Sequence, residues 1–203
     1  NTKSGTFWER GRIGFGGTIT FNGVGVGNSV HSPNVYAMAA GDFASLARAV
    51  AIGNSISTWT PIDLKEQRQI PAIGQVLTVD STYQGNFQDV IWEGVTNTWV
   101  AVGAAGSIFT AVGLTTAEAF SQYSGTLQQL NAVTFGQSEF IAVGNGGVIL
   151  ASNDGTGWSP KVSNTVFDLN DVLYDGSRFI VVGDNGTIGI STDKNFWQPW
   201  SQQ

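Results

Sequence analysis

Residues 130–158 read LNAVTFGQSEFIAVGNGGVILASNDGTGW, and residues 169–197, thirty-nine positions later, read LNDVLYDGSRFIVVGDNGTIGISTDKNFW. The two stretches align without a gap. Each begins with Leu-Asn-x-Val, continues through Phe-Ile-x-Val-Gly and Gly-x-Ile, and ends with a Ser-x-Asp turn and a tryptophan. So many matches at one offset indicate an internal repeat, and a repeat of about 40 residues is typical of β-propeller blades.

Each unit reads as three or four short strands. The Phe-Ile-x-Val-Gly run is almost entirely apolar, as expected for a strand buried on both faces. The glycines that follow it suit tight turns, because glycine tolerates positive φ. A single sheet of this kind cannot bury both faces, so we expect the units to stack radially as blades. A parallel-strand solenoid is the main alternative, and it fits hairpin-rich units of this length less well.

Weaker copies of the unit occur earlier in the chain. The glycine after the apolar run falls at Gly14, Gly53, Gly103, Gly144 and Gly183, with spacings of 39, 50, 41 and 39 residues. The long interval indicates an insertion near residues 61–71.

The repeat predicts one all-β domain over residues 1–203, a β-propeller of about five four-stranded blades or a segment of a larger one. The first anchor lies so near the start that either the two termini share a blade or the chain is cut from something larger. The register predicts a strand over 35–39 followed by a loop, although the alanine-rich stretch 36–50 also suits a short helix. The approximate blade ranges are 1–34, 35–80, 81–122, 123–161 and 162–203.

The composition argues against several classes of partner. Only 12% of the 203 residues are charged, the net charge is -6, and the nine Lys and Arg residues form no cluster. We therefore expect neither nucleic acid nor an anionic membrane surface as a partner. No apolar run is long enough to cross a bilayer, so no membrane insertion is expected. The chain has no cysteine, which excludes disulfides and thiolate metal sites.

The pattern Val-Gly-x-x-Gly-x-Ile, then Ser-x-Asp-Gly and Trp, resembles the Asp-box (bacterial neuraminidase) repeat and the repeat of the photosystem II assembly-factor family. Similar repeats occur in phage virion proteins. The resemblance covers about residues 85–200 well and 10–60 weakly. It implies that the serine and aspartate of the turn satisfy backbone groups and that the tryptophan packs between sheets. The residues concerned are Ser152, Asp154, Gly155, Trp158, Ser191, Asp193 and Trp197.

The resemblance does not imply an enzyme. A sialidase would need an arginine cluster, an acid and a tyrosine nucleophile, and the five arginines here occupy no equivalent positions in the repeat. His31 is the only histidine and has no second candidate ligand, so its expected place is the surface. We expect no catalytic residue, no metal and no cofactor.

Two irregular features are the candidate binding sites. Trp92 and Trp99 bracket a polar hairpin tip, and an exposed tryptophan on such a loop is typical of binding hot spots. Trp99 aligns with Phe140 and Phe179, however, so a core position is the alternative. The insertion carries charges within a predicted loop, which is either a contact loop or only a solvated one. Its candidate residues are Asp63, Lys65, Glu66 and Arg68. We expect the two features to lie on neighbouring blades as one patch.

The resulting hypothesis is a non-catalytic binding or structural module of a phage virion, in the tail or a surface appendage. Its expected partners are other virion proteins or host receptor glycans, and its expected location is the virion or the extracellular space. One alternative is a secreted multivalent lectin, with Trp158, Trp197 and Trp59 as sugar platforms. Another is an assembly factor for a photosynthetic membrane complex.

Overall fold

A computed structural model describes most of the second half of the chain with its side chains and, of the first half, mainly strand backbones. Side chains are described for residues 85–113 and 118–192, and before them for Asn22 and Leu64. The described backbone before residue 85 comprises residues 21–28, 35–41, 45–52, 55–56, 60–61, 63–70 and 75–80. His31, Trp59, Asp193 and Trp197 lie outside the described residues, as do the predicted anchors Gly14 and Gly53.

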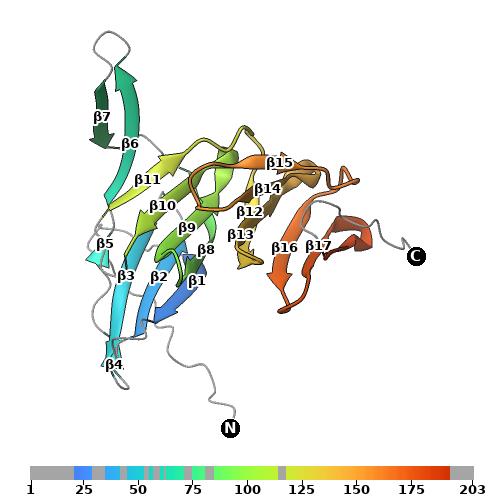
Figure 1. Cartoon of the computed structure of the whole chain (residues 1–203), viewed down its shortest axis with the longest axis horizontal. Coiled ribbons are helices and arrows are strands. Elements are labelled where there is room, and N and C mark those ends of the chain that lie inside the picture. The colour runs from blue at the N-terminus through green and yellow to red at the C-terminus, as the bar shows by residue number, and fades with distance from the viewer. Residues whose placement is uncertain are drawn as a thin grey trace.

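The described strands form four sheets (Figure 1). The first holds β1 (Phe21–Asn28), β2 (Val35–Gly41), β3 (Ser45–Ile52), β4 (Ser55–Ile56) and β5 (Thr60–Pro61). The second runs in the order β7 (Gln75–Asp80), β6 (Asp63–Ile70), β11 (Glu118–Gln122), β10 (Ile108–Val112), β9 (Thr98–Gly103) and β8 (Phe87–Glu93). The third holds β12 (Leu130–Gly136), β13 (Glu139–Gly144), β14 (Ile149–Ser152) and β15 (Ser159–Lys161). The fourth holds β16 (Leu169–Tyr174), β17 (Phe179–Gly183) and β18 (Ile188–Ser191).

The sheets follow one another like blades of a propeller. Strand β1 contacts β8, β8 contacts β12, and β12 contacts β16, so the first strands of the β8–β11, β12–β15 and β16–β18 sheets and of the β1 sheet lie side by side. Strands β8–β11, β12–β15 and β16–β18 fall within the predicted ranges 81–122, 123–161 and 162–203. Sequential antiparallel strands in neighbouring sheets are the arrangement of a β-propeller-type fold. The number of five blades stays a prediction.

The predicted blade boundary at residues 34 and 35 is wrong. Strands β1 and β2 pair across it, with Phe21 opposite Gly41, as Phe87 is opposite Gly103 and Leu130 opposite Gly144. The residue of the first sheet that corresponds to Gly103 and Gly144 is therefore Gly41. The predicted strand over 35–39 is confirmed by β2, but β3 follows where a loop or a helix was expected.

The segment between Pro61 and Pro71 is not a loop. Residues 63–70 form β6, which pairs with β7 and runs parallel to β11. Figure 1 shows the β6–β7 hairpin extending beyond the other strands of its sheet. The insertion thus adds two strands to the outer edge of the second sheet.

A β-bulge recurs at the start of each first strand. The register shifts between Phe87 and Asp89, between Leu130 and Ala132, and between Leu169 and Asp171. The same shift occurs in β1 between Phe21 and Gly23. Because the bulge recurs at equivalent positions, it is a regular part of the repeat and not a local defect.

The anchor glycines are required by close approach of the backbone rather than by positive φ. Gly144 and Gly183 are extended, with φ of -167° and -160°. A Cβ on Gly144 would lie 2.1 Å from the carbonyl oxygen of Gln129, and one on Gly183 would lie 2.3 Å from that of Asp168. The glycine three residues later does have positive φ, 73° at Gly147. Each turn therefore requires its first glycine for close backbone approach and its second for the left-handed conformation.

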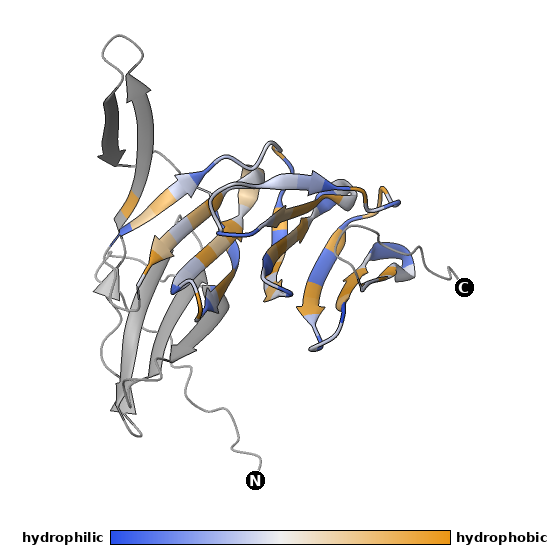
Figure 2. Ribbon diagram, viewed as in Figure 1, coloured by the Kyte–Doolittle hydropathy of each residue, from blue (hydrophilic) through white to orange (hydrophobic). Residues whose placement is uncertain are grey.

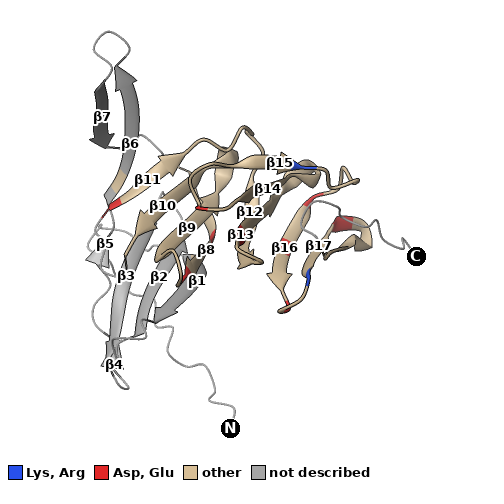
Figure 3. Cartoon of the chain, in the orientation of Figure 1, with Lys and Arg blue, Asp and Glu red and all other residues tan. Residues whose placement is uncertain are grey.

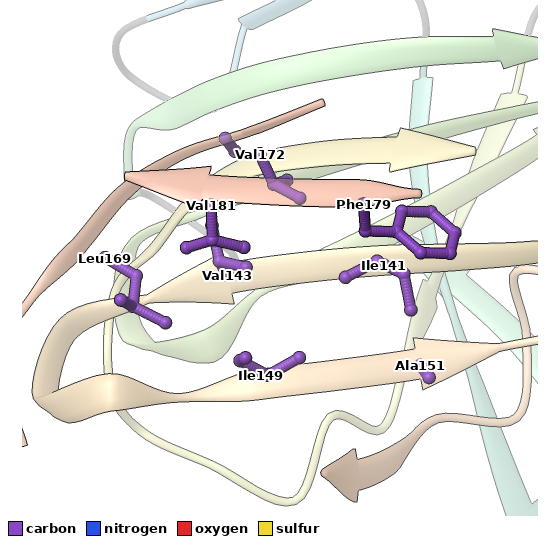
Figure 4. Packing of buried hydrophobic residues seen from close by; sticks show 9 residues of the cluster. Ile141, Val143, Ile149, Ala151, Leu169, Val172, Phe179 and Val181 are labelled. Carbon is purple, nitrogen blue, oxygen red and sulfur yellow. The ribbon is translucent and has the colours of Figure 1, made fainter. Parts of the chain in front are cut away.

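The hydrophobic core lies between successive sheets. Ile141, Val143, Ile149 and Ala151 of one sheet face Leu169, Val172, Phe179 and Val181 of the next (Figure 4). A second cluster joins the β8–β11 sheet to the β12–β15 sheet in the same way. Figure 2 shows apolar residues concentrated on these strands and polar ones toward their ends. No helix in the described part of the chain is long and apolar enough to cross a bilayer.

Candidate protein-docking face

The two tryptophans of the candidate hairpin form an aromatic pair rather than an exposed patch. Trp99 is 1% exposed, within the core of the second sheet, and Trp92 packs against that core from a half-buried position. Their ring centroids are 4.9 Å apart. Equivalent pairs occur in the next two sheets, Phe135 with Phe140 at 4.7 Å and Tyr174 with Phe179 at 4.9 Å. Trp99 is therefore a core residue, which corrects its assignment to a surface.

The charged residues of the insertion do not join this hairpin in one patch. Asp63, Lys65, Glu66 and Arg68 all lie in β6, whose side chains at these positions are outside the described ones. Strands β11, β10 and β9 separate β6 from β8 within a single sheet. The expectation of one patch on neighbouring blades is therefore wrong.

The turn after β14 is held by its own side chains. Ser152 Oγ accepts the backbone N–H of Gly155 at 2.9 Å, and Asp154 Oδ1 accepts those of Thr156 and Gly157 at 2.8 and 3.0 Å. Burial by itself raises the pKa of Asp154, but the hydrogen bonds outweigh it and lower this pKa to about 2. The indole N–H of Trp158 donates to the carbonyl oxygen of Gly155 at 3.0 Å.

This turn also joins two sheets. The hydroxyl of Thr110, on β10, donates to the Gly155 carbonyl at 2.6 Å, and this hydrogen bond is buried. A Cβ on Gly155 would lie 2.9 Å from Cγ2 of Val100. Trp158 is half-buried and its ring lies 6.4 Å from that of Phe140. These contacts are one buried hydrogen bond and two packing contacts, which gives the turn a structural role. Ser191, which occupies the position of Ser152 in the last sheet, is buried, as Ser152 is.

The surface feature that the sequence analysis missed is a pair of equivalent loops, residues 123–129 and 162–168. They connect β11 to β12 and β15 to β16. In each loop a serine hydroxyl donates to the carbonyl two residues later, from Ser124 to Thr126 at 3.2 Å and from Ser163 to Thr165 at 3.1 Å. The Ser-x-Thr pattern recurs at the same 39-residue offset as the strands, and this signal could have revealed the loops.

The loops are held by hydrogen bonds within themselves and by close packing on the turns beside them. Thr126 Oγ1 accepts the N–H of Gln128 at 3.0 Å, and Thr165 Oγ1 accepts that of Phe167 at 3.1 Å. The first loop packs so closely on Gly106 that a Cβ there would lie 2.1 Å from the Thr126 carbonyl oxygen. Each loop is thus held both by its own hydrogen bonds and by close packing.

Both loops present two apolar side chains to solvent. Tyr123 and Leu127 are 86% and 88% exposed, and Val162 and Val166 are 69% and 79% exposed. A shallow depression of about 610 Å³ is lined by residues 161–167. Figure 3 shows few Lys, Arg, Asp or Glu residues along the described strands and loops of this region. We call these four residues on their two loops the apolar loop face.

Comparison with known proteins shows the fold. No protein-family model and no curated protein matches the sequence. Among solved structures, "YCF48 bound to D1 peptide" matches with a TM-score of 0.59 and 16% identity, over 98% of this chain and 58% of that chain. YCF48 from Cyanidioschyzon merolae matches with a TM-score of 0.57 and 18% identity, over 90% and 53%. The computationally designed Ika8 protein matches with a TM-score of 0.52 and 14% identity, over 86% and 46%.

At such low sequence identity, these structural matches support a β-propeller-type fold and do not assign a family or a function. The chain spans about half the length of the solved structures that it matches.

Proposed function

We propose that the chain is a non-catalytic binding module that docks an extended protein segment on its apolar loop face. The observation that carries the proposal is the repetition of the loop. Two rigid loops at the same end of successive sheets hold equivalent pairs of apolar side chains more than two-thirds exposed. Exposed apolar side chains are common singly, but grouped ones mark interaction sites.

Rigidity favours a docking role. Side chains on an already ordered loop lose little conformational entropy on binding, so more of their contact energy appears as affinity. The loops are also almost uncharged, with Lys161 and Asp168 at the two ends of the second. An apolar centre with polar neighbours is the usual anatomy of a protein interface. That a fold neighbour was solved with a peptide bound supports a protein segment as the class of partner.

A virion appendage and an assembly factor both require a docking surface, and the apolar loop face suits either. The lectin hypothesis is less well supported, because the indole N–H of Trp158 is used within its own turn and its ring packs toward Phe140.

The test is selection of peptides from a random displayed library on the 203-residue chain. Enriched peptides should lose about tenfold or more of their affinity for a Leu127→Ser, Val166→Ser double variant, because two apolar contacts are removed. The matched control is Val95→Ser, since Val95 is 92% exposed on the β8–β9 turn, at the other end of its sheet. Equal binding to all three proteins, or no enriched peptide, would contradict the proposal.

A further inference from the structure

The β16–β18 sheet has one covered face and one open face. Its covered face contributes Leu169, Val172, Phe179 and Val181 to the core shared with the preceding sheet (Figure 4). Because side chains alternate along a strand, the residues between these point to the other side. There Leu173, Val182 and Ile188 are 47%, 41% and 53% exposed. We call this side the open face.

Equivalent positions are buried in the preceding sheets. The repeat places Val182 at the position of Val102 and Val143, which are both 0% exposed. It places Ile188 at the position of Ile108 and Ile149, which are 0% and 2% exposed. In those sheets the residues form the core against the next sheet. The open face therefore has the composition of an inter-sheet interface.

Polar groups at the inner edge repeat as well. Asn22 Nδ2 donates to the carbonyl oxygen of Phe87 in the next sheet at 2.7 Å, and Asn131 Nδ2 donates to that of Leu169 at 2.8 Å. Asp89 Oδ2 accepts the N–H of Val133 in the next sheet at 3.0 Å. These bonds fix the register between successive sheets.

The last sheet carries the same two polar positions. Asn170 stands where Asn131 does, and Asp171 stands where Asp89 does. The carboxylate of Asp171 is already oriented, since its Oδ1 accepts the N–H of Val172 at 2.8 Å, as Asp89 Oδ1 accepts that of Val90 at 2.8 Å. The open face thus combines apolar residues with the residue types that join one sheet to the next.

We propose that the open face docks the β1–β3 sheet of a second copy of this chain. Among the described sheets, the β1 and β16 sheets are the two ends of the row, and Figure 1 shows them on opposite sides. By register, Phe21, Val24 and Ala39 hold the positions that Leu130, Val133 and Ala142 hold in the third sheet. Those three third-sheet residues pack against the preceding sheet.

The register also assigns the polar contacts of this interface. Asn170 would donate to the carbonyl oxygen of Phe21 in the second copy, and Asp171 would accept the N–H of Val24 there. Both are the bonds that join the described sheets, continued by one step.

The matching register of the two end sheets supports a second copy as the occupant, and the size of the match is consistent with it. The chain corresponds to 58%, 53% and 46% of the three solved chains. Two copies joined head to tail, each with its last sheet on the first sheet of the other, supply a ring of about that size. Such a pair closes on itself with two-fold symmetry, so no sheet face is left to add further copies.

Light scattering on the purified 203-residue chain is the first test. The expected mass is twice the 21.5 kDa of one chain. Val182→Asp should reduce it to one chain, since a charge would be buried in the interface, while circular dichroism stays unchanged because Val182 is 41% exposed within one copy. The matched control Val166→Asp adds the same charge on the apolar loop face and should leave the mass doubled. A wild-type mass of one chain, or a doubled mass for Val182→Asp, would overturn the proposal.

Cross-linking tests the head-to-tail arrangement. The chain has no cysteine, so single-cysteine variants are unambiguous. A mixture of Asp171→Cys and Val24→Cys chains should be joined by a short bismaleimide, because the equivalent residues Asp89 and Val133 are hydrogen-bonded. Val166→Cys mixed with Val24→Cys should not be joined. Cross-links between two Asp171→Cys chains, with none that join an Asp171→Cys chain to a Val24→Cys chain, would show a face-to-face pair and overturn the proposal.

Discussion

Replacement of Gly147 by alanine tests how tightly the apolar loop face is held. Gly147 has a φ of 73°, and an added Cβ would lie 2.2 Å from the backbone carbonyl oxygen of Thr165 and 3.0 Å from Ser163 Oγ. To reach the 3.4 Å of an ordinary contact, the loop carbonyl would have to move by about 1.2 Å. Because the obstacle is backbone held by its neighbours' hydrogen bonds, this movement is costly.

The expected loss of unfolding free energy follows from two contributions. Left-handed backbone costs a non-glycine residue about 1–2 kcal/mol, of which about 0.4–1 kcal/mol is offset by the reduced entropy of the unfolded chain. Overpacking against the loop adds about 1–3 kcal/mol. Gly147→Ala should therefore destabilise the chain by about 2–4 kcal/mol in urea unfolding.

The neighbouring glycine, Gly146, separates the cost of left-handed backbone from the cost of overpacking. Gly146 also has positive φ, 65°, but the nearest atom to its added Cβ is Gln128 Nε2 at 3.7 Å. Ala105 and Asn185 occupy the equivalent position with φ of 53° and 52°. Gly146→Ala should accordingly cost about 1 kcal/mol.

Gly157→Ala is the neutral control, since its added Cβ meets nothing within 4 Å, and it should change stability by less than about 0.5 kcal/mol. If Gly147→Ala cost no more than Gly146→Ala, the loop would be yielding and the argument for a rigid docking face would fail.

Three further outcomes are expected. Asp154→Ala should cost about 1 kcal/mol at pH 7, because a largely exposed turn loses its acceptor. The pKa of Asp154 is lowered to about 2, so the carboxylate contributes fully above its ordinary pKa of 3.8, and in urea titrations the difference from wild type should shrink below that pH and be lost as the pH falls through about 2. Trp99→Ala should cost about 3–5 kcal/mol, and Trp99→Phe less than half of that, since phenylalanine serves at the equivalent positions and Trp99 Nε1 has no hydrogen-bond partner among the described residues; equal losses would contradict the packing role. Thr110→Val should cost about 1–2 kcal/mol in thermal or urea unfolding, whereas Thr110→Ser, which keeps the donor to Gly155, should recover most of that loss.

The sequence revealed the later sheets because their units have nearly constant length. Gly103, Gly144 and Gly183 lie 41 and 39 residues apart, so a single offset aligned them. Gly41 lies 62 residues before Gly103, because the β6–β7 hairpin intervenes. The run Val50-Ala51-Ile52 followed by Gly53 resembles the repeat, and it gave an anchor 50 residues before Gly103. The residue opposite the start of β1 is instead Gly41.

The candidate tryptophans show a different limit of prediction from the sequence. Trp92 and Trp99 differ in residue type from Phe135, Phe140 and their equivalents, and the difference drew attention to a position that is ordinary in the fold. The strands of one sheet pair locally, so the alignment of Trp99 with Phe140 was sufficient to place it in the core. The pairing of β6 with β11, by contrast, joins residues 55 positions apart at Asp63 and Glu118. No local pattern specifies such a contact, so a charged segment between two prolines was read as a loop.

The polar residue at the bulge connects these observations. Phe21-Asn22-Gly23-Val24 shares its form, an apolar residue followed by an amide and ending in valine, with residues 87–90, 130–133 and 169–172. A bulge leaves one residue unpaired in its own sheet. That residue is Asn22 in β1 and Asn131 in β12, and the side-chain amide of each donates to a backbone carbonyl of the next sheet. The pattern that locates the first sheet is thus also the pattern that joins sheets, and its last copy, at Asn170 and Asp171, stands at the edge of the open face.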